Sequence, residues 1–341
     1  MISIRSNFFY TRTVPCELWF FDRGRPEIMR DRVLMIDARS IYRKVTRKIY
    51  DFSPEQLANI SAIVWLYRGE TKRFLELLSE HLGKVVDEAQ ACFESENEDG
   101  EPIRVLPEYA KSLAALRDEL QPFLKAQPKK GLHAEALAEF DKGQKLFAND
   151  VERFKADVAK SVSRWEKAPD TSPRLNKLVN QLAPLAESSR DLIKQADLLY
   201  KLVCRLIETC ENECDAKSSN VWVGRDITRA RKTADEARRA VVEQLKQVRY
   251  FWRHAHWLTE RFPDGKLCDV EGLVKLVDRA EIEANDWSLT PGRYVGVAPE
   301  EDDDFDFEEA LRDIHVELED LNTEAITLAA TIKKNFEELG V

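Results

Sequence analysis

The chain has 341 residues, of which 43% are hydrophobic and 33% are charged, and its formal net charge is −10. This hydrophobic content is enough for a packed core, which excludes a wholly disordered chain, and 12 glycines with 13 prolines favour long helices over a loop-rich all-β fold. The acidic total argues against a surface that binds nucleic acid throughout. We therefore expect a mainly α fold with a small α/β part.

The basic residues are concentrated near the N-terminus. Residues 1–50 carry eleven Lys or Arg against five acids. Some of these side chains could contact DNA phosphates, although turns and strand ends also expose charge of this kind. The candidates for phosphate contacts are Arg5, Arg12, Arg43 and Lys44.

Two apolar runs in this part, residues 14–21 and 33–36, predict two neighbouring buried strands. A helix should follow, with Ser53 as its N-cap, Pro54 at its first position and Gln56 placed for a capping box. We expect this helix to turn Leu57, with the apolar residues at positions 60 and 64, toward the strands.

The region from residue 71 to 262 predicts four or five antiparallel helices, separated near residues 97–100, 127–131 and 168–173. Its clearest pattern is a heptad repeat that predicts a coiled-coil hairpin about 50 Å long at 1.5 Å per residue. Pro184 lies inside the repeat and should kink the helix or mark its start. The repeat consists of Leu178, Leu185, Leu192, Leu199 and Leu206, with Leu175, Leu182, Ser189, Ala196, Val203 and Cys210 between them.

Two further apolar stripes should pack against this repeat. One comprises Phe147, Val151, Phe154, Val158 and Trp165. The other comprises Ala230, Ala234, Ala237, Val241, Leu245, Val248 and Trp252.

The last part of the chain predicts a turn-rich connector, residues 266–306, that ends in an acidic run at residues 300–309. The run is more typical of a solvated linker than of a cation site. A heptad stripe then follows in residues 307–341 and needs a partner helix. We expect this stripe to dock a partner through Phe307, Leu311, Ile314, Leu318, Leu321 and Leu328.

The cysteines and histidines do not complete a recognisable site. Cys204, Cys210 and Cys214 lack a second Cys or His pair for tetrahedral metal binding, and Cys210 lies on the apolar repeat, so we interpret them as core cysteines. His254 and His256 lie in a helical pattern, which favours packing beside Trp252 and Trp257 over metal binding. The six cysteines should be reduced thiols, because no secretory or transmembrane segment is present and we expect a cytoplasmic protein.

Three segments together resemble the modification subunits of type I restriction–modification systems, which are adenine-N6 DNA methyltransferases. The first two are residues 6–21 and residues 33–39 with the helix that follows. The third is Leu289-Thr290-Pro291-Gly292-Arg293-Tyr294-Val295-Gly296. The resemblance implies that residues 1–70 are the C-terminal piece of a methyltransferase-like sheet. It also implies that the loop at Pro291, Gly292, Arg293 and Tyr294 introduces helices that dock the specificity subunit.

Members of that family bind S-adenosylmethionine through a glycine-rich segment and position a flipped adenine with Asn-Pro-Pro-Phe/Tyr. Neither string occurs in these 341 residues. We therefore carry over no catalytic, cofactor-binding or metal-binding residue, and we expect the chain to bind no cofactor and to be inactive alone.

The resemblance thus leads to the C-terminal portion of a modification subunit. Its expected partners are a specificity subunit, a restriction subunit, a missing N-terminal methyltransferase part, and DNA in the assembled complex. Residues 71–265 would be an inserted helical coiled-coil region. Two alternatives remain open: a coiled-coil scaffold or regulatory protein derived from such a subunit, and a half-enzyme that regains activity with an N-terminal partner.

Overall fold

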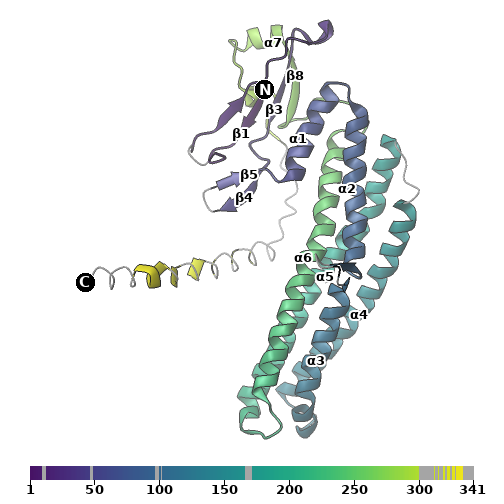
Figure 1. Ribbon diagram of the computed structural model, residues 1–341, viewed down its shortest axis with the longest axis vertical. Coiled ribbons are helices and arrows are strands. Elements are labelled where there is room, and N and C mark those ends of the chain that lie inside the picture. The colour runs from purple at the N-terminus through teal and green to yellow at the C-terminus, as the bar shows by residue number, and fades with distance from the viewer. Residues whose placement is uncertain are drawn as a thin grey trace.

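The computed structural model of the protein describes residues 1–9, 13–46, 49–96, 100, 102–165, 171–298 and twelve positions between 311 and 332. Within these residues the chain forms a small sheet unit at one end of a long helical bundle (Figure 1). The mainly helical fold is confirmed. Every helix in the described part is too polar or too short to cross a lipid bilayer.

The sheet unit has four strands in the order β2-β1-β3-β8. They are β1 (Ile2–Ile4), β2 (Cys16–Leu18), β3 (Arg32–Asp37) and β8 (Val274–Asp278). β1 is parallel to β3, and the other two pairings are antiparallel. Shorter elements surround the sheet: η1 (Glu27–Met29), the hairpin of β4 (Arg43–Thr46) and β5 (Ile49–Asp51), α7 (Arg279–Ala284) and η3 (Pro291–Arg293).

The prediction of two neighbouring buried strands was wrong in two respects. β1 lies between β2 and β3, and the last two residues of β2 are exposed. Residues 14–21 look buried in the sequence because they are aromatic and β-branched, but they lie at the edge of the sheet. The expected connector at residues 266–306 also supplies a strand, since β8 pairs with β3 along five residues.

Helix α1 (Pro54–Tyr67) begins as predicted. The backbone N–H of Gln56 donates to Ser53 Oγ at 3.2 Å, and the N–H of Ser53 donates to Gln56 Oε1 at 2.9 Å, which completes the capping box. The inner face of α1 carries Ile60 and Ile63, whereas Leu57 is 53% exposed, contrary to expectation. The helical period explains this, because Leu57 and Ile63 lie too far apart around the axis to share one narrow face.

Five longer helices form the bundle (Figure 1). They are α2 (Thr71–Ala91), α3 (Val105–Ala126), α4 (Leu132–Trp165), α5 (Ser172–Glu213) and α6 (Gly224–Arg261). A short hairpin of β6 (Ser95–Glu96) and β7 (Pro102–Ile103) joins α2 to α3, and η2 (Ala216–Ser218) lies between α5 and α6. α5 packs against α4 and α6, and α6 also packs against α2 and α3, so the three apolar stripes meet as predicted.

The heptad repeat of α5 is buried at all of its predicted positions. Pro184 does not mark the start of the helix, which begins at Ser172 and continues through the proline. Packing against α4 and α6 on both sides offsets the loss of one backbone hydrogen bond at Pro184. The coiled-coil interpretation of this repeat stays a prediction.

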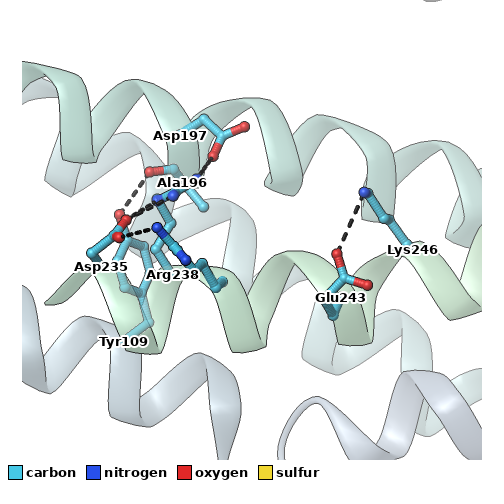
Figure 2. Close-up of polar contacts among 8 residues, drawn as sticks. Tyr109, Ala196, Asp197, Asp235, Arg238, Glu243 and Lys246 are labelled. Carbon is cyan, nitrogen blue, oxygen red and sulfur yellow. Dashed lines mark hydrogen bonds and ion pairs between the residues drawn. The ribbon is translucent and has the colours of Figure 1, made fainter. Parts of the chain in front are cut away.

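An ionic cluster lies inside the bundle (Figure 2). The Arg238 guanidinium on α6 donates to Asp197 of α5 at 2.6 Å and to Asp235 at 2.7 Å, and Asp197 is only 5% exposed. Nearby, the Tyr109 hydroxyl of α3 donates to the carbonyl of Ala196 at 2.6 Å. These contacts fix α3, α5 and α6 in one register.

The ionic cluster yields a stability prediction. We expect Arg238→Met to lower the free energy of unfolding by about 3–5 kcal/mol, because two carboxylates would remain beside an apolar group with one of them buried. Arg239→Met is the matched control, since Arg239 contacts the same Asp235 at 3.0 Å but is 69% exposed, and should cost about 0–1 kcal/mol. Urea unfolding of both variants measures the difference; equal costs would contradict the assignment.

Candidate assembly site

An exposed apolar strip follows the edge of the sheet. We define this edge surface as Val14, Leu18, Trp19, Phe20 and Phe21, which are 62%, 37%, 52%, 66% and 87% exposed. Its members flank or terminate β2, the outermost strand of the sheet. Contiguous apolar residues beside an unpaired strand edge are typical of protein–protein contact sites.

A cavity of about 310 Å³ lies beside the edge surface. Phe20 belongs to both, and the other walls come from the start of β1, from β3 and from α1, including Ile2, Val33 and Tyr67. Arg25 lines the cavity and lies 5.8 Å from the Tyr67 ring centroid. A side chain from a partner could therefore insert next to the exposed aromatic residues.

The loop expected to introduce the docking helices packs at the C-terminal end of β3. Pro291 and Tyr294 are buried, and Gly292 lies over the ion pair of Asp37 and Arg39, whose closest atoms are 2.6 Å apart. A Cβ at Gly292 would stand 2.7 Å from Arg39 Nη2. Burial is the main cause that raises the pKa of Tyr294. The loop is thus part of the sheet unit, and its glycine permits the close approach.

A tight turn holds this loop in place. The N–H of Gly272 donates to the carbonyl of Val295 at 2.6 Å, and Gly272 has a φ of +72°. A Cβ there would meet the backbone nitrogen of Ala298 at 2.3 Å, a distance that no side chain tolerates. Sequence reasoning missed Gly272 because the approaching backbone lies 26 residues farther along the chain.

A polar junction connects the sheet unit to the bundle. Asn59 of α1 contacts His81 of α2 at 3.0 Å and His254 of α6 at 3.3 Å, while the Tyr250 hydroxyl lies 2.7 Å from Glu55. Burial lowers the pKa of both histidines to about 4, so they are neutral at pH 7. His254 is therefore part of the polar contact between α1 and α6.

The remaining cysteine and histidine predictions have different outcomes. His256 stacks on Trp252 with ring centroids 4.8 Å apart, as expected, and Cys210 is fully buried. Cys214 is partly buried, packs against the hydrophobic core and contacts His133. Cys204 is also partly buried. The described residues contain no group of three or more possible metal ligands.

The four candidates for DNA phosphate contacts lie in different surroundings. The Arg5 guanidinium lies over the rings of both Tyr42 and Tyr50, at 3.8 and 3.9 Å from their centroids, and so supports the β4–β5 hairpin. Arg43 and Lys44 are exposed on β4, and Arg43 pairs with Asp51 at 2.6 Å. Arg12 lies outside the described residues.

The C-terminal stripe is exposed at each described position. Its leucines and isoleucine are helical and between 45% and 58% exposed. Phe307 and the acidic run at residues 300–309 lie outside the described residues. The described members are Leu311, Ile314, Leu318, Leu321 and Leu328.

Comparison with known proteins relates the N-terminal part to one family. Residues 1–88 match the family model for N-6 DNA methylases. The chain is 40% identical over 72 residues to the type I restriction enzyme HindI methylase subunit of Haemophilus influenzae, a match that covers 21% of this chain and 16% of that relative. No solved structure gives a significant match. The chain is therefore related to type I methylase subunits through its N-terminal quarter, which confirms that part of the resemblance. The likeness of residues 289–296 stays a prediction.

The turn at Gly272 yields a second prediction. Gly272→Ala should cost several kcal/mol, because backbone strain adds to a clash with Ala298. Gly69→Ala is the matched control: its φ is +75° but no atom lies within 4 Å of the added Cβ, so it should cost only about 1 kcal/mol. Thermal unfolding and limited proteolysis of the 289–296 loop measure the effect. Similar melting temperatures for the two variants would show that the loop is not held by this turn.

The polar junction yields a pH prediction. The unfolded chain binds more protons than the folded chain between the ordinary histidine pKa of 6.5 and the folded value of about 4. Stability is therefore complete above pH 6.5 and falls as the pH decreases to 4, by about 3 kcal/mol for His81. His81→Gln should reduce this dependence by the part that His81 contributes and leave the part that His254 contributes. Urea unfolding between pH 4 and 7 tests this; a wild-type slope retained in His81→Gln would contradict the assignment.

Proposed function

We propose that this chain is a component of a type I restriction–modification methylase and that it contributes assembly with a specificity subunit. The observation that carries the proposal is the family match over residues 1–88, which includes the whole edge surface. A segment related to a methylase subunit thus presents an exposed apolar strip and a neighbouring cavity. Both are suited to a protein partner.

The edge surface supports contact with a methyltransferase part. Its backbone has an unpaired strand edge at β2, and Trp19, Phe20 and Phe21 would be covered by a strand or helix laid along it. We propose that this partner is the N-terminal methyltransferase part expected from the resemblance. That part would carry the S-adenosylmethionine site and the adenine pocket, since the present sequence contains neither string.

The C-terminal stripe supports contact with the specificity subunit. Apolar residues at heptad spacing that are half exposed need a partner helix to exclude water. The loop at Pro291 and Gly292 packs against β3 and precedes the C-terminal stripe in the chain. We propose that this loop orients residues 307–341 for docking, and that Arg43 and Lys44 contact DNA phosphates in the assembled complex.

A second function, a coiled-coil scaffold or regulator derived from such a subunit, has its own support. Most of the bundle lies outside the family match, because α3 to α6 begin at Val105 and the match ends at residue 88. These four helices supply most of the buried residues of the large hydrophobic core, which also includes Leu34 and Ile36 of β3. Self-association without affinity for a specificity subunit would favour this reading.

The docking proposal is tested by Leu318→Asp. We expect loss of co-purification with a type I specificity subunit, because a charge without a partner would enter an apolar contact. Ile326→Asp is the matched control: Ile326 is 72% exposed and lies off the heptad stripe, so binding should persist.

Two outcomes would contradict the proposal. If Leu318→Asp co-purifies as well as the unchanged chain, the stripe does not dock the subunit. If the unchanged chain forms only homo-oligomers in size-exclusion chromatography with the specificity subunit present, the scaffold function replaces the assembly function.

A further inference from the structure

A cysteine and a histidine form a pair at the end of the bundle far from the sheet unit. Cys214 follows the last residue of α5, and His133 lies in the first turn of α4. The Cys214 Sγ is 3.4 Å from His133 Nδ1. Residues about 80 positions apart therefore meet where the α3–α4 and α5–α6 turns lie side by side, at the lower end of Figure 1.

The neighbouring groups determine which atom donates the hydrogen in this contact. His133 Nε2 is 2.8 Å from the carbonyl oxygen of Pro128, which can only accept, so Nε2 carries a hydrogen. In the neutral ring Nδ1 is then an acceptor for the Cys214 thiol. Cys214 is thus a nucleophile in contact with a base, His133, and the Pro128 carbonyl orients that base. This arrangement activates thiols in proteins.

His133 lines a cavity of about 320 Å³, and the Cys214 sulfur lies 3.4 Å from its Nδ1 without lining the cavity itself. His133 is only 7% exposed. Arg117, Lys125 and Lys129 also line it, and its described lining residues include no carboxylate. Asp141 neutralises Arg117 at 3.0 Å, which leaves the two lysines as the cations that favour a negatively charged ligand.

The turn that carries Cys214 is anchored. Trp222 is 7% exposed and packs edge-on against Phe123 with ring centroids 5.1 Å apart, and Ala216 is fully buried. The pair is therefore held by tertiary packing.

Among the described residues, Cys214 is the cysteine with a histidine within hydrogen-bond distance of its sulfur. Burial raises the pKa of Cys210 to about 12 and also raises the pKa of Cys16, Cys92 and Cys204. Cys268 is exposed, but burial of its sulfur and the neighbouring Asp269 and Asp264 raise its pKa too. Cys268 is therefore a control for exposure without activation.

We propose that Cys214 is a modification site that forms a mixed disulfide with an anionic low-molecular-weight disulfide, with His133 as the base. The Cys214 thiol gives its proton to His133 Nδ1, and the resulting thiolate attacks one sulfur of the disulfide. The sulfur–sulfur bond of the reagent breaks and a new one forms to Cys214. The other half leaves as a thiolate, which takes up the proton.

The first test is a competition within the unchanged chain. With oxidised glutathione at pH 7.4, mass spectrometry of the digested protein should find Cys214 modified at least about tenfold faster than Cys268. With the neutral bis(2-hydroxyethyl) disulfide the advantage should shrink, because the lysines no longer attract the reagent. Faster reaction at Cys268 would overturn the proposal.

The second test separates activation from packing. His133→Gln should slow modification of Cys214 about tenfold and leave Cys268 unchanged. If His133 only fills space, its replacement would expose Cys214 and speed the reaction, and that result would overturn its role as the base.

The third test concerns the ligand class. The double variant Lys125→Gln, Lys129→Gln changes only exposed side chains. It should slow the reaction with oxidised glutathione and not the reaction with the neutral disulfide. Equal effects on both reagents would overturn the assignment of an anionic ligand.

Discussion

The antiparallel pairing of β3 with β8 is the constraint on which the rest of the structure depends. It places Leu34 opposite Leu276 and so brings together two segments with the whole helical bundle between them. Closing so long a loop costs conformational entropy, which the buried residues of both strands offset. The chain leaves the sheet after β3 and re-enters it at β8, so the first and the last helix of the bundle are both connected to the sheet unit. β8 also carries the Gly272 turn and the 289–296 loop to the end of β3.

The bundle and the sheet unit are joined by polar as well as apolar contacts. Asn59 reaches both His81 and His254, and neutral histidines are required for this packing because burial disfavours their charged form. Farther along the bundle, Arg238 binds two carboxylates between α5 and α6. Buried polar groups of this kind select one register among the many that an apolar helix seam allows.

This architecture contains three surfaces for which we propose different roles. The edge surface belongs to the segment related to type I methylase subunits, and we assign it to assembly. The exposed C-terminal stripe is the proposed contact for a specificity subunit. The pair of Cys214 and His133 lies at the opposite end of the bundle, so modification there need not interfere with either contact.

The sequence by itself determined the local features: the capping box at Ser53, the heptad repeat of α5 and the family relationship of the N-terminal part. The capping box depends on hydrogen bonds within one turn, and the heptad repeat depends on periodic burial along one helix. The family relationship depends on the order of residues in a continuous segment. Only the tertiary structure decided that residues 14–21 form an exposed edge, that β8 completes the sheet and that Cys214 meets His133. Strand order and paired side chains depend on contacts between distant segments, and no local pattern encodes which distant segment arrives.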